Sequence, residues 1–313
     1  MILSVSRRTD IPSYYSEWFI NRIRDGFYYT YDKRENKYNK ISLSPKNVDV
    51  IVFWTKNAIP LISHLNELSS RGYRFYFQYT INPYGKDIEP EIVNKRDILK
   101  SFEKISTVYG KDAVVWRYDP ILINDKYSVN FHKKSFAQLC KAISPYTNEC
   151  VISFVKDFER GQQLAYYRIP SNTEIDEIAK SFGNTAKKYG LKLTTCCEKA
   201  DLTKYGINHS ACIDREKIES ILHDSILVEK DKTQGKGCRC IQSVDIGQFN
   251  SCISKCAYCN SGGVQDFLCK YNFANNHIDS PLFTGVVDKK IQIKLKKYPS
   301  ILCNNQVSFN DMN

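Results

Sequence analysis

The sequence has no apolar run long enough to cross a bilayer and no basic start followed by an apolar stretch. It also lacks a phosphate-binding P-loop, the dinucleotide fingerprint G-x-G-x-x-G and a nucleophile elbow. Its five histidines show no metal-ligand spacing among themselves. These absences predict a soluble, cytoplasmic protein with no membrane partner, whose function does not depend on any of the three motifs.

Hydrophobic residues make up 42% of the 313 residues and charged residues 25%, a composition that supports a large core and excludes a disordered chain. The formal net charge is +11, and a basic balance can attract nucleic acid or another anion. Because no compact block of lysine and arginine occurs, a solvated lysine-rich surface is the preferred interpretation. Nucleic-acid binding stays open as the alternative.

Apolar, strand-like segments alternate with amphipathic, helix-like segments along the chain. The expected strands are residues 2–6, 48–54, 74–80, 113–121, 150–155 and 191–198, and residues 241–247 would add another. The expected helices are residues 17–27, 58–72, 90–108, 131–143 and 172–190, the last with Asn172 or Thr173 near its cap. The polar segment 29–46 predicts a long loop or a small ribbon. Six strands alternating with five helices favour a TIM-like parallel α/β barrel, full or partial, as one domain over residues 1–313.

Polar side chains follow the apolar part of each expected strand, where parallel α/β folds place their chemistry. They are Arg7, Arg8, Thr9 and Asp10; Thr55, Lys56 and Asn57; Gln78, Thr80 and Asn82; Arg117 and Asp119; Ser153 and Lys156; and Glu198. Any one of them could be a surface ion pair or a loop cap. As a set they predict a polar cavity at one rim of the sheet.

Ten of the twelve cysteines lie between Cys196 and Cys303. Such clustering in a chain without secretion signals favours metal binding over disulfides. Cys252, Cys256 and Cys259 form a C-x-x-x-C-x-x-C motif in one short stretch. Thiolates hold iron–sulfur clusters, and three of them leave one iron with an open position, as a catalytic metal site requires. These three cysteines are therefore the candidate catalytic and metal-binding residues.

This spacing, with Tyr258 directly before the last cysteine, resembles the signature of the radical S-adenosylmethionine superfamily. The resemblance implies a [4Fe-4S] cluster whose open iron binds the amino and carboxylate groups of S-adenosylmethionine. It further implies that an electron from an external flavodoxin- or ferredoxin-like donor splits a carbon–sulfur bond. The products are methionine and a 5′-deoxyadenosyl radical, which takes a hydrogen atom from a small-molecule or nucleic-acid substrate that the sequence does not identify.

The resemblance also implies roles for the residues around the cluster. Tyr258 would pack near the adenine. The residues expected to line the cavity and to hold the cofactor's carboxylate, its ribose or the substrate are Arg7, Arg8, Lys56, Gln78, Arg117 and Asp119. Arginine suits a carboxylate because its planar fork donates two parallel charge-assisted hydrogen bonds.

The cysteine motif follows the last expected strand, whereas in most of the superfamily it follows the first. This order resembles a bacterial family of unknown function with a C-terminal cysteine cluster, through "SRRTDIP", "FWTKN", "WRYDPI", "ISF" and "SVDIGQFNSC". It implies a circularly permuted barrel in which residues 190–263 carry the cluster region and the last strand pairs with the first. Gly262 and Gly263 are followed by no glutamate, so they are expected to form a turn.

Four further cysteines, Cys197, Cys212, Cys238 and Cys240, could complete a second, closed [4Fe-4S] site. A structural zinc site and free buried thiols are the alternatives. Cys196 is set aside because adjacent residues of a strand point to opposite faces. The competing function is an iron–sulfur- or zinc-stabilised nucleic-acid-binding protein without turnover.

Overall fold

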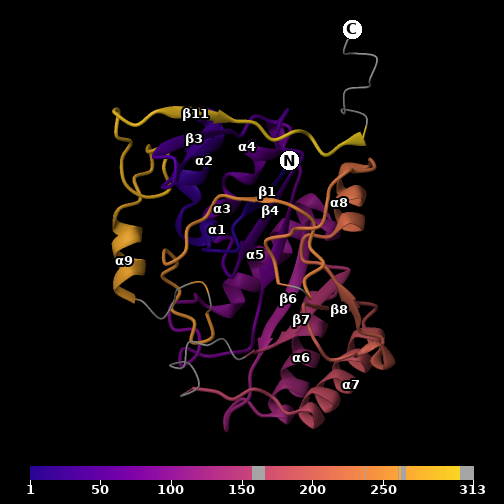
Figure 1. Ribbon diagram of the computed structural model, residues 1–313. Helices are drawn as coiled ribbons and strands as arrows, with labels where there is room; N and C mark the ends of the chain where they lie inside the picture. Colours follow the sequence, from indigo (N-terminus) through magenta and orange to yellow (C-terminus); the bar gives the residue numbers. More distant parts are fainter. Residues whose placement is uncertain (157–165, 236, 260, 262–265, 304–313) are drawn as a thin grey trace.

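The computed structural model describes residues 1–156, 166–235, 237–259, 261 and 266–303 (Figure 1). Eight parallel strands form one sheet in the order β10–β1–β4–β5–β6–β7–β8–β9. In chain order they are β1 (Ile2–Val5), β4 (Val50–Thr55), β5 (Phe75–Thr80), β6 (Val114–Ile121), β7 (Glu149–Phe154), β8 (Lys192–Cys196), β9 (Asn208–Ser210) and β10 (Val244–Asp245). The predicted parallel α/β architecture is confirmed.

The two ends of this sheet are β9 and β10, and no strand pair between them is found in the described residues, so the structure shows no closed barrel. The pairing expected of the last strand is confirmed, since Leu3 of β1 lies opposite Val244 and Ser4 opposite Asp245. The segments that flank the two edge strands do meet, because the Ile241 N–H donates to the Ile213 C=O at 3.1 Å.

Alternation along the strands gives the sheet two buried faces. One face packs against the helices through residues such as Leu3, Phe53 and Trp116. The other face carries Ile2, Val50, Val52, Tyr76, Val115 and Val151, which pack against residues 211–213, Cys238, Cys240, Ile241 and Ile301. Because both faces are covered, the strands appear in the sequence as nearly continuous apolar runs.

The α-helices are α1 (Ile11–Tyr14), α2 (Ser16–Asp25), α3 (Ile59–Ile62), α4 (Leu65–Ser70), α5 (Lys95–Tyr109), α6 (Val129–Ile143), α7 (Asn172–Lys188), α8 (Arg215–Leu222) and α9 (Asp266–Ala274), with 3₁₀ turns at Lys111–Ala113 and Thr203–Tyr205. The helix expected at residues 58–72 is divided into α3 and α4. Ser171, rather than the expected Asn172 or Thr173, caps α7 in a reciprocal capping box with Glu174. No described helix is long and apolar enough to cross a membrane.

A second, three-stranded sheet contains the ribbon expected near residues 29–46. Its strands are β2 (Phe27–Asp32), β3 (Lys37–Ser42) and β11 (Ile293–Lys296), in the order β11–β3–β2. From β11 the chain continues across the molecule toward α8 (Figure 1). On that path the Ile301 N–H donates to the Asp49 carboxylate, which also pairs with the Met1 ammonium group.

Gly247 allows a close approach between the ends of β10 and β1. A Cβ atom at position 247 would lie 2.6 Å from the Cβ of Ser6. The Ser6 hydroxyl donates to the Asp245 carboxylate at 2.6 Å, and the Gly247 N–H donates to the same carboxylate at 3.0 Å. Only glycine leaves room for Ser6 at this contact.

We therefore expect Gly247→Ala to push β10 away from β1 and to lower the free energy of unfolding by about 1–3 kcal/mol, as overpacking does in other buried sites. Gly235→Ala is the matched control, because no heavy atom lies within 4 Å of the Cβ position there. Urea unfolding of both variants provides the comparison. An equal loss of stability in the two variants would contradict this account of Gly247.

Candidate functional site

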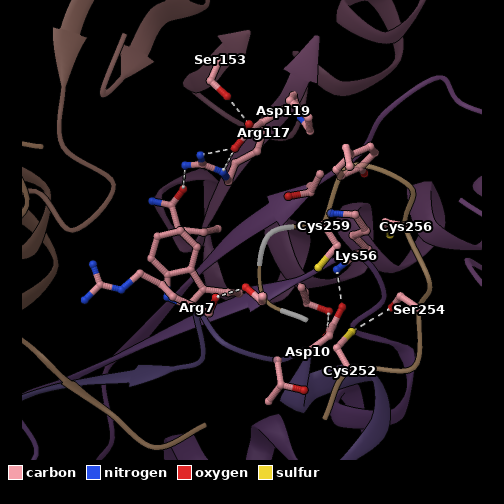
Figure 2. A pocket seen from close by; sticks show the side chains of 18 of the residues that line it. Arg7, Asp10, Lys56, Arg117, Asp119, Ser153, Cys252, Ser254, Cys256 and Cys259 are labelled. Atoms are coloured by element: carbon pink, nitrogen blue, oxygen red, sulfur yellow. Dashed lines mark hydrogen bonds and ion pairs between the residues drawn. The ribbon is translucent and has the colours of Figure 1, made fainter. Parts of the chain in front are cut away.

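A cavity of about 380 Å³ lies at the C-terminal ends of the central strands (Figure 2). Cys252, Cys256 and Cys259 all line it. So do the residues expected to bind the cofactor, namely Arg7, Arg8, Lys56, Gln78, Arg117, Asp119 and Tyr258. The structure thus brings the three motif cysteines together with all seven residues expected to bind the cofactor, from the N-terminal and the C-terminal parts of the chain.

The three cysteines lie on one loop that follows β10. The Cys259 N–H donates to the Cys256 C=O at 3.0 Å, and Lys255 between the motif cysteines has the left-handed backbone φ of 54°. The Cys252 thiol donates to the Ser254 hydroxyl at 3.3 Å. Figure 2 shows the Cys252 and Cys259 sulfurs near Asp10 and Lys56. The loop therefore presents its thiols to the cavity from one side.

Tyr258 fixes this loop to the segment that follows β5. Its hydroxyl donates to the Glu89 carboxylate and accepts a hydrogen bond from Asn82 Nδ2 at 3.0 Å. The Ala257 N–H donates to the Ile88 C=O at 2.9 Å. The Tyr258 ring also faces the Lys56 ammonium group, 5.3 Å from the ring centroid.

Asp10 and Lys56 form the charged floor beside the thiols. Burial raises the pKa of Asp10 to about 6, although the carboxylate accepts hydrogen bonds from the Lys56 N–H at 2.8 Å and the Thr55 hydroxyl at 2.7 Å. Burial acts to lower the pKa of Lys56, but the Coulombic effects of Cys256, Glu89 and other acidic groups raise it overall. Burial, followed by the charge of Cys259, raises the pKa of Cys252 to about 11. Thiolate formation there requires a compensating cation, which a bound metal supplies.

Arg117 of β6 is held by the protein on several sides. Its guanidinium is paired with Asp119 and donates from Nη1 to Gln78 Oε1 at 3.2 Å and to Cys212 Sγ at 3.0 Å. Burial acts to raise the pKa of Asp119, but Arg117 and the Ser153 hydroxyl lower it overall. Arg117 and Asp119 therefore form a buried, charged pair in the wall of the cavity.

The lining of the cavity is strongly cationic. Among the described residues it contains six basic side chains, Arg7, Arg8, Lys56, Arg117, Lys156 and Lys255, and two carboxylates, Asp10 and Asp119. Arg7 is partly neutralised by Asp231 at 3.2 Å, and Arg8 donates to the Gly247 C=O at 3.3 Å. This excess of positive charge suits the cavity to an anionic ligand.

A second group of thiols lies at the inner face of the sheet, the face that carries Ile2, Val50 and Tyr76. It includes one cysteine that was not in the expected set. Cys212, Cys238 and Cys240 share one buried cluster against which Cys196 packs, and the Cys212 thiol donates to Cys196 Sγ at 2.7 Å. Cys196, which strand alternation had excluded from the expected set, belongs to this group and also lines the cavity. Cys197 follows β8 with a left-handed φ of 55°, and its sulfur lies 3.5 Å from the Cβ position of Gly237.

In the part of the chain that the structure describes, no three His, Cys, Asp or Glu side chains are placed so that they could hold a single metal ion. None of the twelve cysteines, all of which lie in the described residues, forms a disulfide. Three thiols presented by one loop to a cavity fit a polynuclear cluster, in which each thiolate binds a different iron. Gly262 and Gly263, expected as a turn, lie outside the described residues.

Two acidic residues of the site were not found by sequence reasoning. Glu89 holds the Tyr258 hydroxyl and pairs with Lys95, and Asp245 of β10 accepts hydrogen bonds from Ser4 and Ser6. Glu89 has no motif around it that could have identified it. Asp245 stands in the "SVDIG" segment, where its place opposite Ser4 depends on the pairing of β10 with β1.

Comparison with known proteins adds one family match. The model of a family described as "Domain of unknown function (DUF1848)" matches residues 2–261. No curated protein matches the chain. Among solved structures, a "putative alpha-L-fucosidase" from Bacteroides thetaiotaomicron is 13% identical, with 74% of this chain and 86% of that chain covered and a TM-score of 0.24. A similarity this low carries no argument about fold or function.

Because Tyr258 anchors the cysteine loop through a buried hydroxyl, we expect Tyr258→Phe to lower the free energy of unfolding by about 1–3 kcal/mol, the cost of leaving a buried polar partner unsatisfied. Tyr31→Phe removes a comparable hydroxyl from an exposed hydrogen bond to Asn36 and should change stability by less than about 0.5 kcal/mol. Urea unfolding of the two variants tests this expectation. Indistinguishable stabilities would show that the hydroxyl of Tyr258 does not anchor the loop.

Proposed function

This chain belongs to the DUF1848 family, described as a domain of unknown function, and we propose that it is a radical S-adenosylmethionine enzyme. The family description assigns no activity, so the proposal rests on the residues of this chain. The observation that carries it is the position of Cys252, Cys256 and Cys259, which line one cavity together with the basic strand-end residues.

In this proposal the three cysteines hold a [4Fe-4S] cluster and leave one iron open. Such a cluster, once reduced by an external flavodoxin- or ferredoxin-like donor, would supply the one electron that cleaves S-adenosylmethionine. The 5′-deoxyadenosyl radical released with methionine would then take a hydrogen atom from the substrate. Lys56 supplies a positive charge near Cys256 that offsets the negative charge of the thiolates. Tyr258 and Glu89 hold the loop so that the thiols stay on the cavity wall.

The cationic lining provides binding groups for the cofactor and the substrate. Arg7, Arg8 and Lys56 are the proposed partners of the carboxylate of S-adenosylmethionine, since each lies in the lining and carries a donor. Tyr258 is the proposed neighbour of the adenine. Arg117 is occupied by Asp119, Gln78 and Cys212, so we assign it a positioning role in the wall.

We further propose that the sheet acts as a partial, permuted barrel. From β5, Gln78 Nε2 and the Tyr76 hydroxyl both donate to the Cys212 C=O, at 2.7 and 3.2 Å, in the segment after β9. Because β5 and β9 are separated by three strands in the sheet, these contacts support strong curvature of the sheet around its inner face. A curved sheet of this kind shields a reactive intermediate from water. A reducing cytoplasm, which keeps thiols free, is the proposed location.

The test is anaerobic reconstitution with iron and sulfide, followed by dithionite and S-adenosylmethionine. We expect 5′-deoxyadenosine from the wild-type chain and only the level of the protein-free reaction from Cys256→Ala, because one cluster ligand is lost. Cys303→Ala is the control, since Cys303 is exposed and lies outside the cavity lining; it should keep wild-type production. Liquid chromatography with mass spectrometry measures the product.

Wild-type protein that holds iron and sulfide but forms no 5′-deoxyadenosine would contradict the proposed activity. The competing function, a metal-stabilised nucleic-acid-binding protein without turnover, remains a prediction. It would require binding that weakens steeply with salt, because phosphate contacts release counterions.

A further inference from the structure

Four cysteine side chains from three separate segments meet beside the cavity. Cys196 ends β8, Cys212 follows β9, and Cys238 and Cys240 precede β10. Cys212, Cys238 and Cys240 belong to one buried cluster against which Cys196 packs, and the Cys212 thiol donates to Cys196 Sγ at 2.7 Å. We name these four residues the thiol quartet. All four lie within residues 196–240, yet their meeting depends on the approach of the sheet's two edges.

Hydrogen-bond donors surround the sulfurs of the quartet. Arg117 Nη1 lies 3.0 Å from Cys212 Sγ. The Ile213 N–H donates to Cys240 Sγ at 3.4 Å, and the Cys240 N–H donates to Cys238 Sγ at 3.4 Å. A neutral thiol is a weak acceptor, whereas a thiolate attracts such donors strongly. Two backbone donors and a permanent cation directed at these sulfurs suit an anionic, metal-bound form.

The burial of the quartet also indicates a metal-bound form. Cys212, Cys238 and Cys240 are 5%, 6% and 2% exposed, and Arg117 beside them is 6% exposed. Isolated thiolates in such a place would be unfavourable, because burial penalises the charged form. A metal centre shared by four thiolates removes that penalty and leaves Arg117 to balance the remaining negative charge.

We propose that Cys196, Cys212, Cys238 and Cys240 together hold a metal centre, either a [4Fe-4S] cluster or Zn²⁺, both of which accept four thiolates. The 2.7 Å between the Cys212 and Cys196 sulfurs is too short to surround an ion. Tetrahedral zinc with bonds of about 2.3 Å requires sulfurs about 3.8 Å apart. To bind zinc, these two thiols must therefore separate by about 1 Å, which agrees with the lack of a preformed single-ion site in the described residues. A cubane needs a larger separation, because each thiolate binds a different iron.

This centre would reach the cavity through Cys196, which lines it together with the three cysteines of the loop. A ligand that fills the cavity would then have access to two thiolate-held groups. The inference goes beyond the proposed function and does not depend on it, because the quartet shares no cysteine with the loop.

The experiment uses the full chain with Cys252→Ala, Cys256→Ala and Cys259→Ala combined, so that any bound metal reports on the quartet alone. This triple variant is analysed for iron, sulfide and zinc after anaerobic purification and again after reconstitution with iron and sulfide. A cluster would give about four irons and four sulfides per chain, together with visible absorption from sulfur-to-iron charge transfer. Zinc would give about one ion per chain and no such absorption.

Neighbouring cysteines provide matched variants in this background. We expect Cys196→Ser to lower the bound metal at least about 10-fold, in line with loss of a metal ligand or its support. Cys197→Ser should keep it, since Cys197 is not part of the quartet. Equal retention or equal loss in the two variants would overturn the assignment.

A second measurement remains informative even if Cys196→Ser fails to fold. X-ray absorption at the iron or zinc edge of the triple variant should show sulfur neighbours at about 2.3 Å. A folded triple variant that binds neither metal, or a metal whose neighbours are nitrogen or oxygen, would contradict the proposal. Because these readouts involve no S-adenosylmethionine, they are independent of whether the loop cysteines support catalysis.

Discussion

Asp245 joins the last strand of the main sheet to the first, and the site depends on that contact. Its carboxylate accepts hydrogen bonds from the hydroxyls of Ser4 and Ser6 at 2.7 and 2.6 Å and from the Arg7 N–H at 2.8 Å. Parallel pairing of β10 with β1 thereby places the C-terminal cysteine loop beside the N-terminal strand end. Without this pairing, the three loop thiols and the Arg7–Asp10 segment would have no common cavity. A parallel sheet can bring distant segments together in this way because adjacency in the sheet does not follow adjacency in the chain.

The second constraint is the concentration of charged side chains in one cavity. Buried charges are tolerated when each has partners, and the cavity satisfies this through linked groups. Arg117 is the central member, since it contacts Asp119, Gln78 and Cys212 and thus connects the cavity wall to the thiol quartet. Lys56 has the corresponding position beside Cys256 and Asp10. The excess of basic side chains is consistent with anionic ligands and with the negative charge of metal-bound thiolates.

Several elements were predictable because the sequence pattern is local. The strands that became β1, β4, β5 and β6 are apolar on both faces, and their recognition required no tertiary information. In contrast, β9 (Asn208–Ser210) is short and polar, and it is a strand only because it pairs with β8. The barrel was expected from the number of strand–helix units, but a count cannot determine whether β9 and β10 meet. The site residues at the strand ends were also predictable. Each of them directly follows an apolar run, and such a run is visible in the sequence.

Cys196 and Cys197 illustrate the limit most clearly. Alternation predicted that they point to opposite faces, but both pack against the same buried cluster. The reason is that β8 ends at Cys196, and Cys197 has a left-handed φ of 55°, so the alternation of a strand does not continue to it. We propose above that the loop thiols leave one iron open for S-adenosylmethionine. Electron–nuclear double resonance tests this proposal most directly. The sample is the reduced, reconstituted chain with S-adenosylmethionine that carries ¹⁵N at its amino group. We expect a hyperfine coupling between the label and the cluster that disappears in Cys256→Ala. A reduced cluster with no coupling to the label would contradict it.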